Sequence, residues 1–137
     1  MMTKAMIAMV AVAALVLGSW RVAHACDCGG TLASGIAHAD AVFWGEIVAE
    51  VPHEKHSARF TVEVKGVWKG SVTKRMYVFT DASSCGFKGL GKVRFLFVTT
   101  EQDSRLWAHL CDGSQLATQK VRDQVTKIAG PARAPKR

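Results

Sequence analysis

The sequence predicts a small, mainly β domain: a barrel of five short strands, with one helix before it and one after it, held by two disulfides. The first observation is alternation over 59–68, where Phe60, Val62 and Val64 are separated by polar residues, the period of a half-buried strand. The second is that the other apolar stretches are short and bounded by turn residues. The third is an even number of cysteines, four, in a short chain. Closing the strands into a barrel would leave no exposed sheet edge.

The first 25 residues are predicted to be a signal peptide. Lys4 supplies the positive start, residues 5–17 form an unbroken apolar run, and residues 23–25 fit the small-x-small rule for cleavage. The apolar run is shorter than the roughly 20 residues of a membrane helix, so we expect no transmembrane segment after cleavage. Lipoproteins also have a cysteine after their cleavage site, but His24 stands where their motif has a small residue. We expect a secreted or periplasmic protein that begins at Cys26.

The predicted mature chain keeps 112 of the 137 residues, enough for one domain, which we place at 26–129. It carries 16 basic and 11 acidic residues, and this net charge of +5 favours loose contact with polyanions. Residues 130–137 hold Arg133, Lys136 and Arg137 among prolines and alanines. They predict a solvated, disordered tail rather than a nucleic-acid-binding arm. We expect a monomer with no specific nucleic-acid partner.

All four cysteines, Cys26, Cys28, Cys85 and Cys111, lie in the predicted mature chain. An even count in a short exported chain favours two disulfides. A bridge between Cys26 and Cys28 would close a very tight, strained ring, so each is expected to pair with a distant partner. Two pairings remain open: 26–85 with 28–111, or 26–111 with 28–85.

The first elements follow from the apolar pattern. Residues 31–40 have a weak helical pattern that Thr31 can cap. An apolar strand over 41–51 is predicted to end at Pro52, and a polar loop should lead to the alternating strand over 59–68. Within that strand, Gly66 predicts a bulge.

The second half of the chain predicts three strands and a helix. The strands are expected over 75–80, 93–99 and 105–110, and the helix over 116–128, starting after Ser114. They are joined by a turn at 69–70, a loop over 81–91 that contains Cys85, and a turn at 101–104.

The sequence contains no catalytic constellation, and we expect neither enzymatic activity nor a cofactor. The mature histidines show no pairing with a nucleophile and no H-E-x-x-H spacing; they are His38, His53, His56 and His109. His53 and His56 fall in a polar loop and are interpreted as solvated rather than metal-binding. The Cys26-x-Cys28 motif lacks the context of a redox pair or of a zinc knuckle, whereas a structural disulfide would stabilise a small domain by about 2–4 kcal/mol.

Cleavage before Cys26 would create an unusual terminus. A free α-amino group has a reference pKa of about 7.7–8.0, so part of it is neutral and can donate a lone pair to a metal ion. The carbonyl oxygen of Cys26 lies close enough in the chain to bind the same ion. A disulfide at this residue would hold both groups rigid and reduce the entropy lost on binding.

The chain resembles the tissue inhibitors of metalloproteinases, a family with a netrin-like OB-fold. The similarity runs over about 26–128 and rests on the order of several features. These are cleavage before Cys-x-Cys, a helix leading into HADAVFWGEIV, the alternating FTVEVKGVWKG, a cysteine in ASSCG, and another in CDGS before a helix. The resemblance implies a single-domain form of that family with a small OB-fold-like barrel.

The resemblance also implies roles for individual residues. The amine and carbonyl of Cys26 would chelate the catalytic zinc of a target metalloendopeptidase. Asp27, where the family usually has a small residue, would point into the protease's specificity pocket, and Ser83 with Ser84 would flank the cleft. The family's pairing corresponds to Cys26–Cys85 and Cys28–Cys111.

A second function fits the same sequence. A netrin-like module without inhibitory activity would bind a partner protein or a polyanion through basic strand residues. The candidates are Lys65, Lys69, Lys74 and Arg75.

Overall fold

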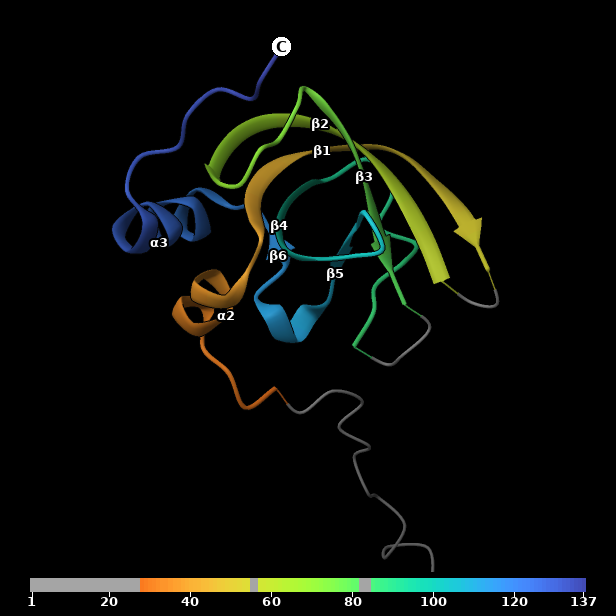
Figure 1. Ribbon diagram of the computed structural model, residues 1–137, viewed down its shortest axis with the longest axis horizontal. Coiled ribbons are helices and arrows are strands. Elements are labelled where there is room, and N and C mark those ends of the chain that lie inside the picture. Colours follow the sequence, from red (N-terminus) through yellow and green to blue (C-terminus); the bar gives the residue numbers. More distant parts are fainter. Residues whose placement is uncertain (1–27, 55–56, 82–84) are drawn as a thin grey trace, which may run out of the picture.

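The computed structural model describes residues 28–54, 57–81 and 85–137 (Figure 1). The predicted signal peptide and Cys26 therefore lie outside the described residues. In chain order the elements are α2 (Leu32–His38), β1 (Ala41–His53), β2 (Ser57–Lys69), β3 (Arg75–Thr80), β4 (Arg94–Gln102), β5 (Arg105–Ala108), the 3-10 turn η1 (Leu110–Asp112), β6 (Gln115–Leu116) and α3 (Gln119–Ala129). None of the helices in these residues is long and apolar enough to span a membrane.

The strands close into the predicted barrel. Neighbours pair in the order β1-β2-β3-β5-β4, and β4 pairs back with β1. The neighbouring strands of the barrel are antiparallel except β3 and β5, which run parallel, with Val78 opposite Leu106 and Phe79 opposite Trp107. A closed ring with an odd number of strands cannot alternate direction throughout, so at least one neighbouring pair must be parallel. The mainly β class and the five-stranded barrel are confirmed.

Aromatic rings fill the barrel. Phe97 is fully buried and lies 5.4 Å from the Phe43 ring and 5.2 Å from the Phe95 ring, measured between centroids. Phe87 comes from the predicted loop over 81–91, yet it is only 6% exposed and its ring lies 4.8 Å from Phe95. The loop therefore contributes to the core, and the Phe87 amide donates a hydrogen bond to Thr80 Oγ1.

The first hairpin is longer than predicted. β1 continues through Pro52 to His53, and Pro52 lies opposite Ala58. β4 pairs only with residues 41–46 of β1, so Pro52 lies where β1 has a strand on one side only, a position that tolerates a missing N–H. The bulge predicted at Gly66 is confirmed, since the register shifts between Trp44 opposite Gly66 and the next pair.

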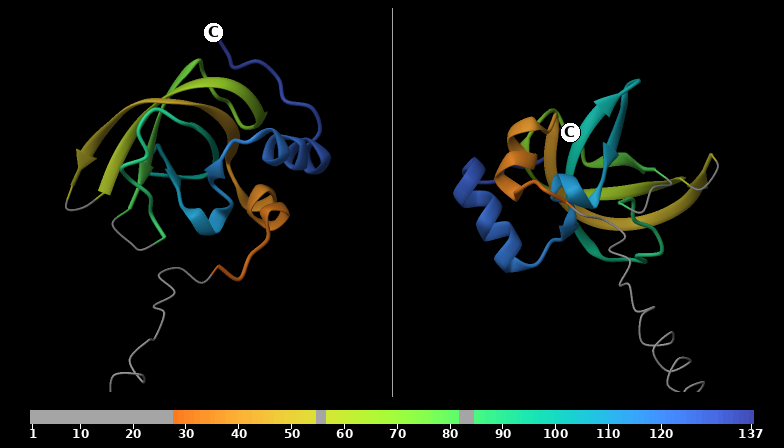
Figure 2. Two further views of the ribbon diagram at one scale, coloured as in Figure 1. Left: turned by 180° about the vertical axis from the view of Figure 1, so that it is seen from behind. Right: turned by 90° about the horizontal axis from the view of Figure 1, so that it is seen from below.

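The two helices pack together against one side of the barrel (Figure 2). Thr31 caps α2 as predicted, and its hydroxyl accepts a hydrogen bond from the Ser34 amide. The C-terminal helix begins later than predicted, at Gln119 with Thr118 as its cap. Ser114 is buried and bonds the backbone of Val98 in β4, which directs the chain into the short strand β6 before the helix begins.

The C-terminal tail was predicted to be disordered, and the structure corrects this. Arg133 exchanges two backbone hydrogen bonds with Val67, at 2.8 and 2.9 Å, and the Lys136 amide donates to Val72. β3 pairs with β2 only over residues 58–63, so one side of β2 is open at Val67. Buried backbone groups require partners, and the tail supplies them along this edge.

Candidate functional site

Three cysteines gather at one end of the barrel, and we call Cys28, Cys85 and Cys111 the cysteine junction. Cys28 and Cys111 form a disulfide, with their Cα atoms 4.9 Å apart. This pairing is the one that the family resemblance implied. Cys85 is also disulfide-bonded, and its Sγ lies 3.6 Å from that of Cys111. The junction thus joins the chain segment before α2, the loop after β3 and η1.

The residues expected to contact a protease lie outside the described residues: they are Cys26, Asp27, Ser83 and Ser84. Cys26, the implied partner of Cys85, is one of these residues. Their neighbours in the chain are described. Cys28 directly follows Asp27, and Cys85 directly follows Ser84. Two segments separated by more than fifty residues are therefore attached to the same junction.

A histidine holds the loop after β3 against η1. His109 Nε2 lies 2.8 Å from Asp81 Oδ2, and its Nδ1 lies 3.3 Å from Asp112 Oδ2. The Leu110 amide also donates a 2.9 Å hydrogen bond to the carbonyl of Cys85. His109 was predicted to be structural, and these contacts agree with that role. Its spacing to Asp112 was visible in the sequence, whereas its pairing with Asp81, 28 residues earlier, had no local signal.

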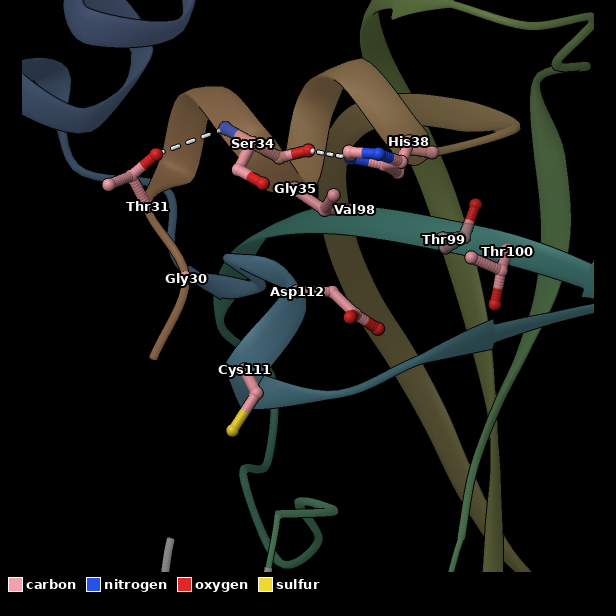
Figure 3. A pocket seen from close by; sticks show the side chains of 11 residues that line it. Gly30, Thr31, Ser34, Gly35, His38, Val98, Thr99, Thr100, Cys111 and Asp112 are labelled. Carbon is pink, nitrogen blue, oxygen red and sulfur yellow. Dashed lines mark hydrogen bonds between the residues drawn. The ribbon is translucent and has the colours of Figure 1, made fainter. Parts of the chain in front are cut away.

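A polar pocket opens beside the junction, between α2, β4 and η1 (Figure 3). Its volume is about 200 Å³. Figure 3 shows the Asp112 carboxylate between η1 and β4, with the Cys111 sulfur pointing away from α2. His38 lines the pocket, and its Nδ1 lies 2.8 Å from the carbonyl of Ser34. The surface around the junction is therefore hollowed and polar.

The close approach of α2 to η1 depends on Gly35. A Cβ atom at this position would lie 2.0 Å from the carbonyl oxygen of Asp112 and 2.8 Å from its carbonyl carbon. Both are backbone atoms, so they cannot move aside as a flexible side chain would. Glycine thus lets the helix pack directly on the turn that carries Cys111.

We expect Gly35→Ala to destabilise the protein by about 1–3 kcal/mol, because the overlap separates α2 from η1. A loss of stability would be specific to the close contact, since Gly→Ala within an unobstructed helix raises stability by about 1 kcal/mol. Denaturant unfolding measures the change. Ser34→Ala is the matched control at a neighbouring exposed helix position. Equal or greater stability of Gly35→Ala would contradict the close contact.

The four basic residues proposed for partner binding do not act together. Lys65, Lys74 and Arg75 line one open hollow of about 530 Å³ with Glu63. Lys69 is elsewhere: its Nζ donates to the carbonyls of Ile36 and Ala37, at 3.2 and 3.0 Å. Cations stabilise helix C-termini, so Lys69 serves the end of α2. The hollow remains basic because Glu63 is one acid facing three cations.

The histidine pair of the first hairpin is only half described. His56 lies outside the described residues, while His53 packs edge-on against Phe79, with ring centroids 4.8 Å apart. Among the described residues, no group of three or more His, Cys, Asp or Glu side chains is arranged so that it could hold a metal ion.

Comparison with known protein families returns no matching family model, and comparison with curated proteins returns no significant match.

Proposed function

We propose that the protein inhibits a zinc metalloendopeptidase through its mature N-terminus. The α-amine and carbonyl of Cys26 would occupy two positions on the catalytic zinc, in place of the water and substrate that an open zinc site accepts. The observation that supports this most is the cysteine junction. It anchors the residue after Asp27 and the residue after Ser84 at one place, as a two-segment protease-binding edge requires.

The surroundings of the junction favour a rigid binding edge. The Cys28–Cys111 disulfide fixes the chain two residues after the proposed chelating group. The contact of His109 with Asp81 and that of the Leu110 amide with the carbonyl of Cys85 hold these two residues against the segment around η1. An inhibitor that is already held in its bound conformation loses less entropy on binding.

Asp27 narrows the class of target. Moving an ionised carboxylate into an apolar pocket without a partner is strongly unfavourable. We therefore propose endopeptidases whose specificity pocket is polar or basic. A protease with a purely apolar pocket should be inhibited poorly, and Asp27→Ala should improve its inhibition.

The test combines two measurements on the exported protein. Intact-mass and peptide spectrometry give the first residue and the disulfide map, and inhibition constants are measured against a panel of zinc endopeptidases that differ in pocket polarity. Cys26 as first residue, with inhibition of the polar-pocket members, would support the proposal. A start at any other residue, or no inhibition across the panel, would refute it.

The basic hollow supports a second candidate function, contact with a polyanion. Lys65 on β2, Arg75 at the start of β3 and Lys74 just before it line the same hollow, and their joint charge favours an anionic ligand.

We expect the variant Lys74→Gln with Arg75→Gln to weaken binding of a sulfated polymer such as dextran sulfate by about tenfold, with a shallower salt dependence. Lys69→Gln is the internal contrast. It should lower thermal stability, because it removes the cation at the end of α2, and should leave binding within about twofold. Unchanged affinity in the double variant would show that the hollow is not the binding site for the polymer.

A further inference from the structure

The outer face of β2, β3 and β5 carries a second group of cations, which alternate with aromatic rings. Along these strands the side chains that point away from the barrel core follow the period of two. Cross-strand pairing places Arg59 opposite Phe79, and Phe79 opposite Trp107. We call the set Arg59, Tyr77, Phe79, Arg105 and Trp107 the arginine-aromatic face.

The guanidinium groups of this face lie over aromatic rings. Arg59 Cζ is 4.8 Å from the centroid of Tyr77, and Arg105 Cζ is 5.3 Å from that of Phe79. Phe79 in turn packs against Trp107, with centroids 5.5 Å apart. Such contacts hold a guanidinium by cation–π attraction while its N–H edge stays available to a ligand.

These arginines have no acidic partner in the described part of the chain. The Arg59 side chain donates no hydrogen bond to the described residues, and its Nε is buried without a partner. The only polar contact of the Arg105 side chain with the described residues is to the Nε2 of His53, at 3.4 Å. Arg75, one step along the same face, differs because Glu63 lies 3.5 Å from it. A charge that is held in place without a counter-charge is complementary to an anion.

One ring of the face is also open to solvent. Tyr77 is 53% exposed although it lies in the middle of β3. It lies between the stacked arginines and the basic hollow, because Arg75 is two residues away on the same side of the strand. From Arg59 to Lys65 along β2, the combined surface extends about 20 Å at roughly 3.3 Å per residue. This length suits a linear ligand of several units.

We propose that this face binds an acidic polysaccharide, a chain of sulfated or uronic-acid sugars. The inference rests on the second candidate function and names its ligand. Sugar rings would stack on Tyr77 and Trp107 through their C–H faces, and the acid groups would meet the guanidinium edges of Arg59 and Arg105 and the cations of the hollow. The disulfides support this choice, because they favour an oxidising compartment outside the cytoplasm, where acidic glycans are the common linear polyanions.

The experiment measures binding of a fluorescent heparin-derived decasaccharide to the exported protein at several salt concentrations. Tyr77→Ala is expected to weaken binding about tenfold, as the loss of a stacking ring does. Arg59→Gln with Arg105→Gln should weaken it and reduce the salt dependence. The matched control, Lys120→Gln with Lys127→Gln, removes two exposed cations from α3 and should change affinity less than about twofold. Melting temperatures show that each variant is folded.

Other outcomes separate the proposals. Binding that is lost in the hollow variant but unchanged in Tyr77→Ala would keep the second candidate function and overturn the arginine-aromatic site. No binding of the decasaccharide at any salt concentration would overturn both. Equal affinity for a single-stranded oligothymidylate of similar length, lost equally in Tyr77→Ala, would replace the polysaccharide with nucleic acid. Binding to neutral dextran would refute the role of charge.

Discussion

A variant with one alanine added before Cys26 is expected to lose at least about 100-fold in inhibition, which corresponds to roughly 2.7 kcal/mol of binding free energy. The added residue converts the α-amine of Cys26 into a peptide nitrogen, whose lone pair is delocalised into the amide and cannot bind zinc. The new terminal amine is displaced by one residue and no longer lies beside the Cys26 carbonyl. The measurement is the inhibition constant against an endopeptidase that the unmodified chain inhibits.

The control adds the same residue at the other end of the chain, after Arg137. Both extended proteins should melt at the same temperature as the parent, because neither alters the barrel or the cysteine junction. The α-amine can also be blocked chemically by acetylation, which should have the same effect as the N-terminal alanine. Full inhibition by the extended chain would eliminate chelation by Cys26, although binding through Ser83 and Ser84 could persist.

The fold was predictable where buried and exposed side chains alternate along a short stretch of sequence. The alternation around Phe60, Val62 and Val64 gives β2 directly, because one face of this strand lines the core and the other does not. The helix cap at Thr31 was also predictable, because it depends only on residues next to it in the sequence. By contrast, the parallel pairing of β3 with β5 depends on closing an odd number of strands, which no window of sequence contains.

The errors share a physical cause. Leu116 has the spacing of a helix face, but the buried hydroxyl of Ser114 commits the chain to β6 first, and Leu116 remains 52% exposed. The composition of the tail is that of a disordered segment, yet Arg133 finds unpaired backbone groups on β2. In each case a tertiary contact decides the structure, and local propensity is too weak to oppose it.

The sequence predicted which residue types form the candidate site, but not the contacts that hold them in place. Cysteine spacing leaves two pairings open, and the structure contains the Cys28–Cys111 bridge. Lys69 was assigned to a binding surface because charge alone cannot distinguish a ligand contact from a helix cap. The bond between His109 and Asp81 joins residues that only the barrel brings together.

The double variant Cys28→Ala with Cys111→Ala should lower the free energy of unfolding by about 2–4.5 kcal/mol. The two cysteines are 83 residues apart in the sequence, and a loop of that length has a closure entropy worth about 4.5 kcal/mol in the chain-entropy model. For a domain of this size the loss corresponds to a fall in melting temperature of roughly 10–25 °C. Replacing both partners avoids a free thiol, and thermal and denaturant unfolding measure the effect. A loss below about 1 kcal/mol would show that the bridge hardly constrains the unfolded chain.

The same variant connects stability to the proposed inhibition. At a temperature where it is still folded, the barrel and the loop contacts of His109 should persist, but the chain next to Asp27 is no longer tied to η1. The proposed chelating terminus would then have to be ordered on binding, at an entropic cost of about 1–2 kcal/mol for each residue fixed. Inhibition should therefore weaken by at least about tenfold while the melting transition stays cooperative. Unchanged inhibition in a destabilised but folded protein would show that this disulfide holds the barrel alone, and that the terminus is positioned without it.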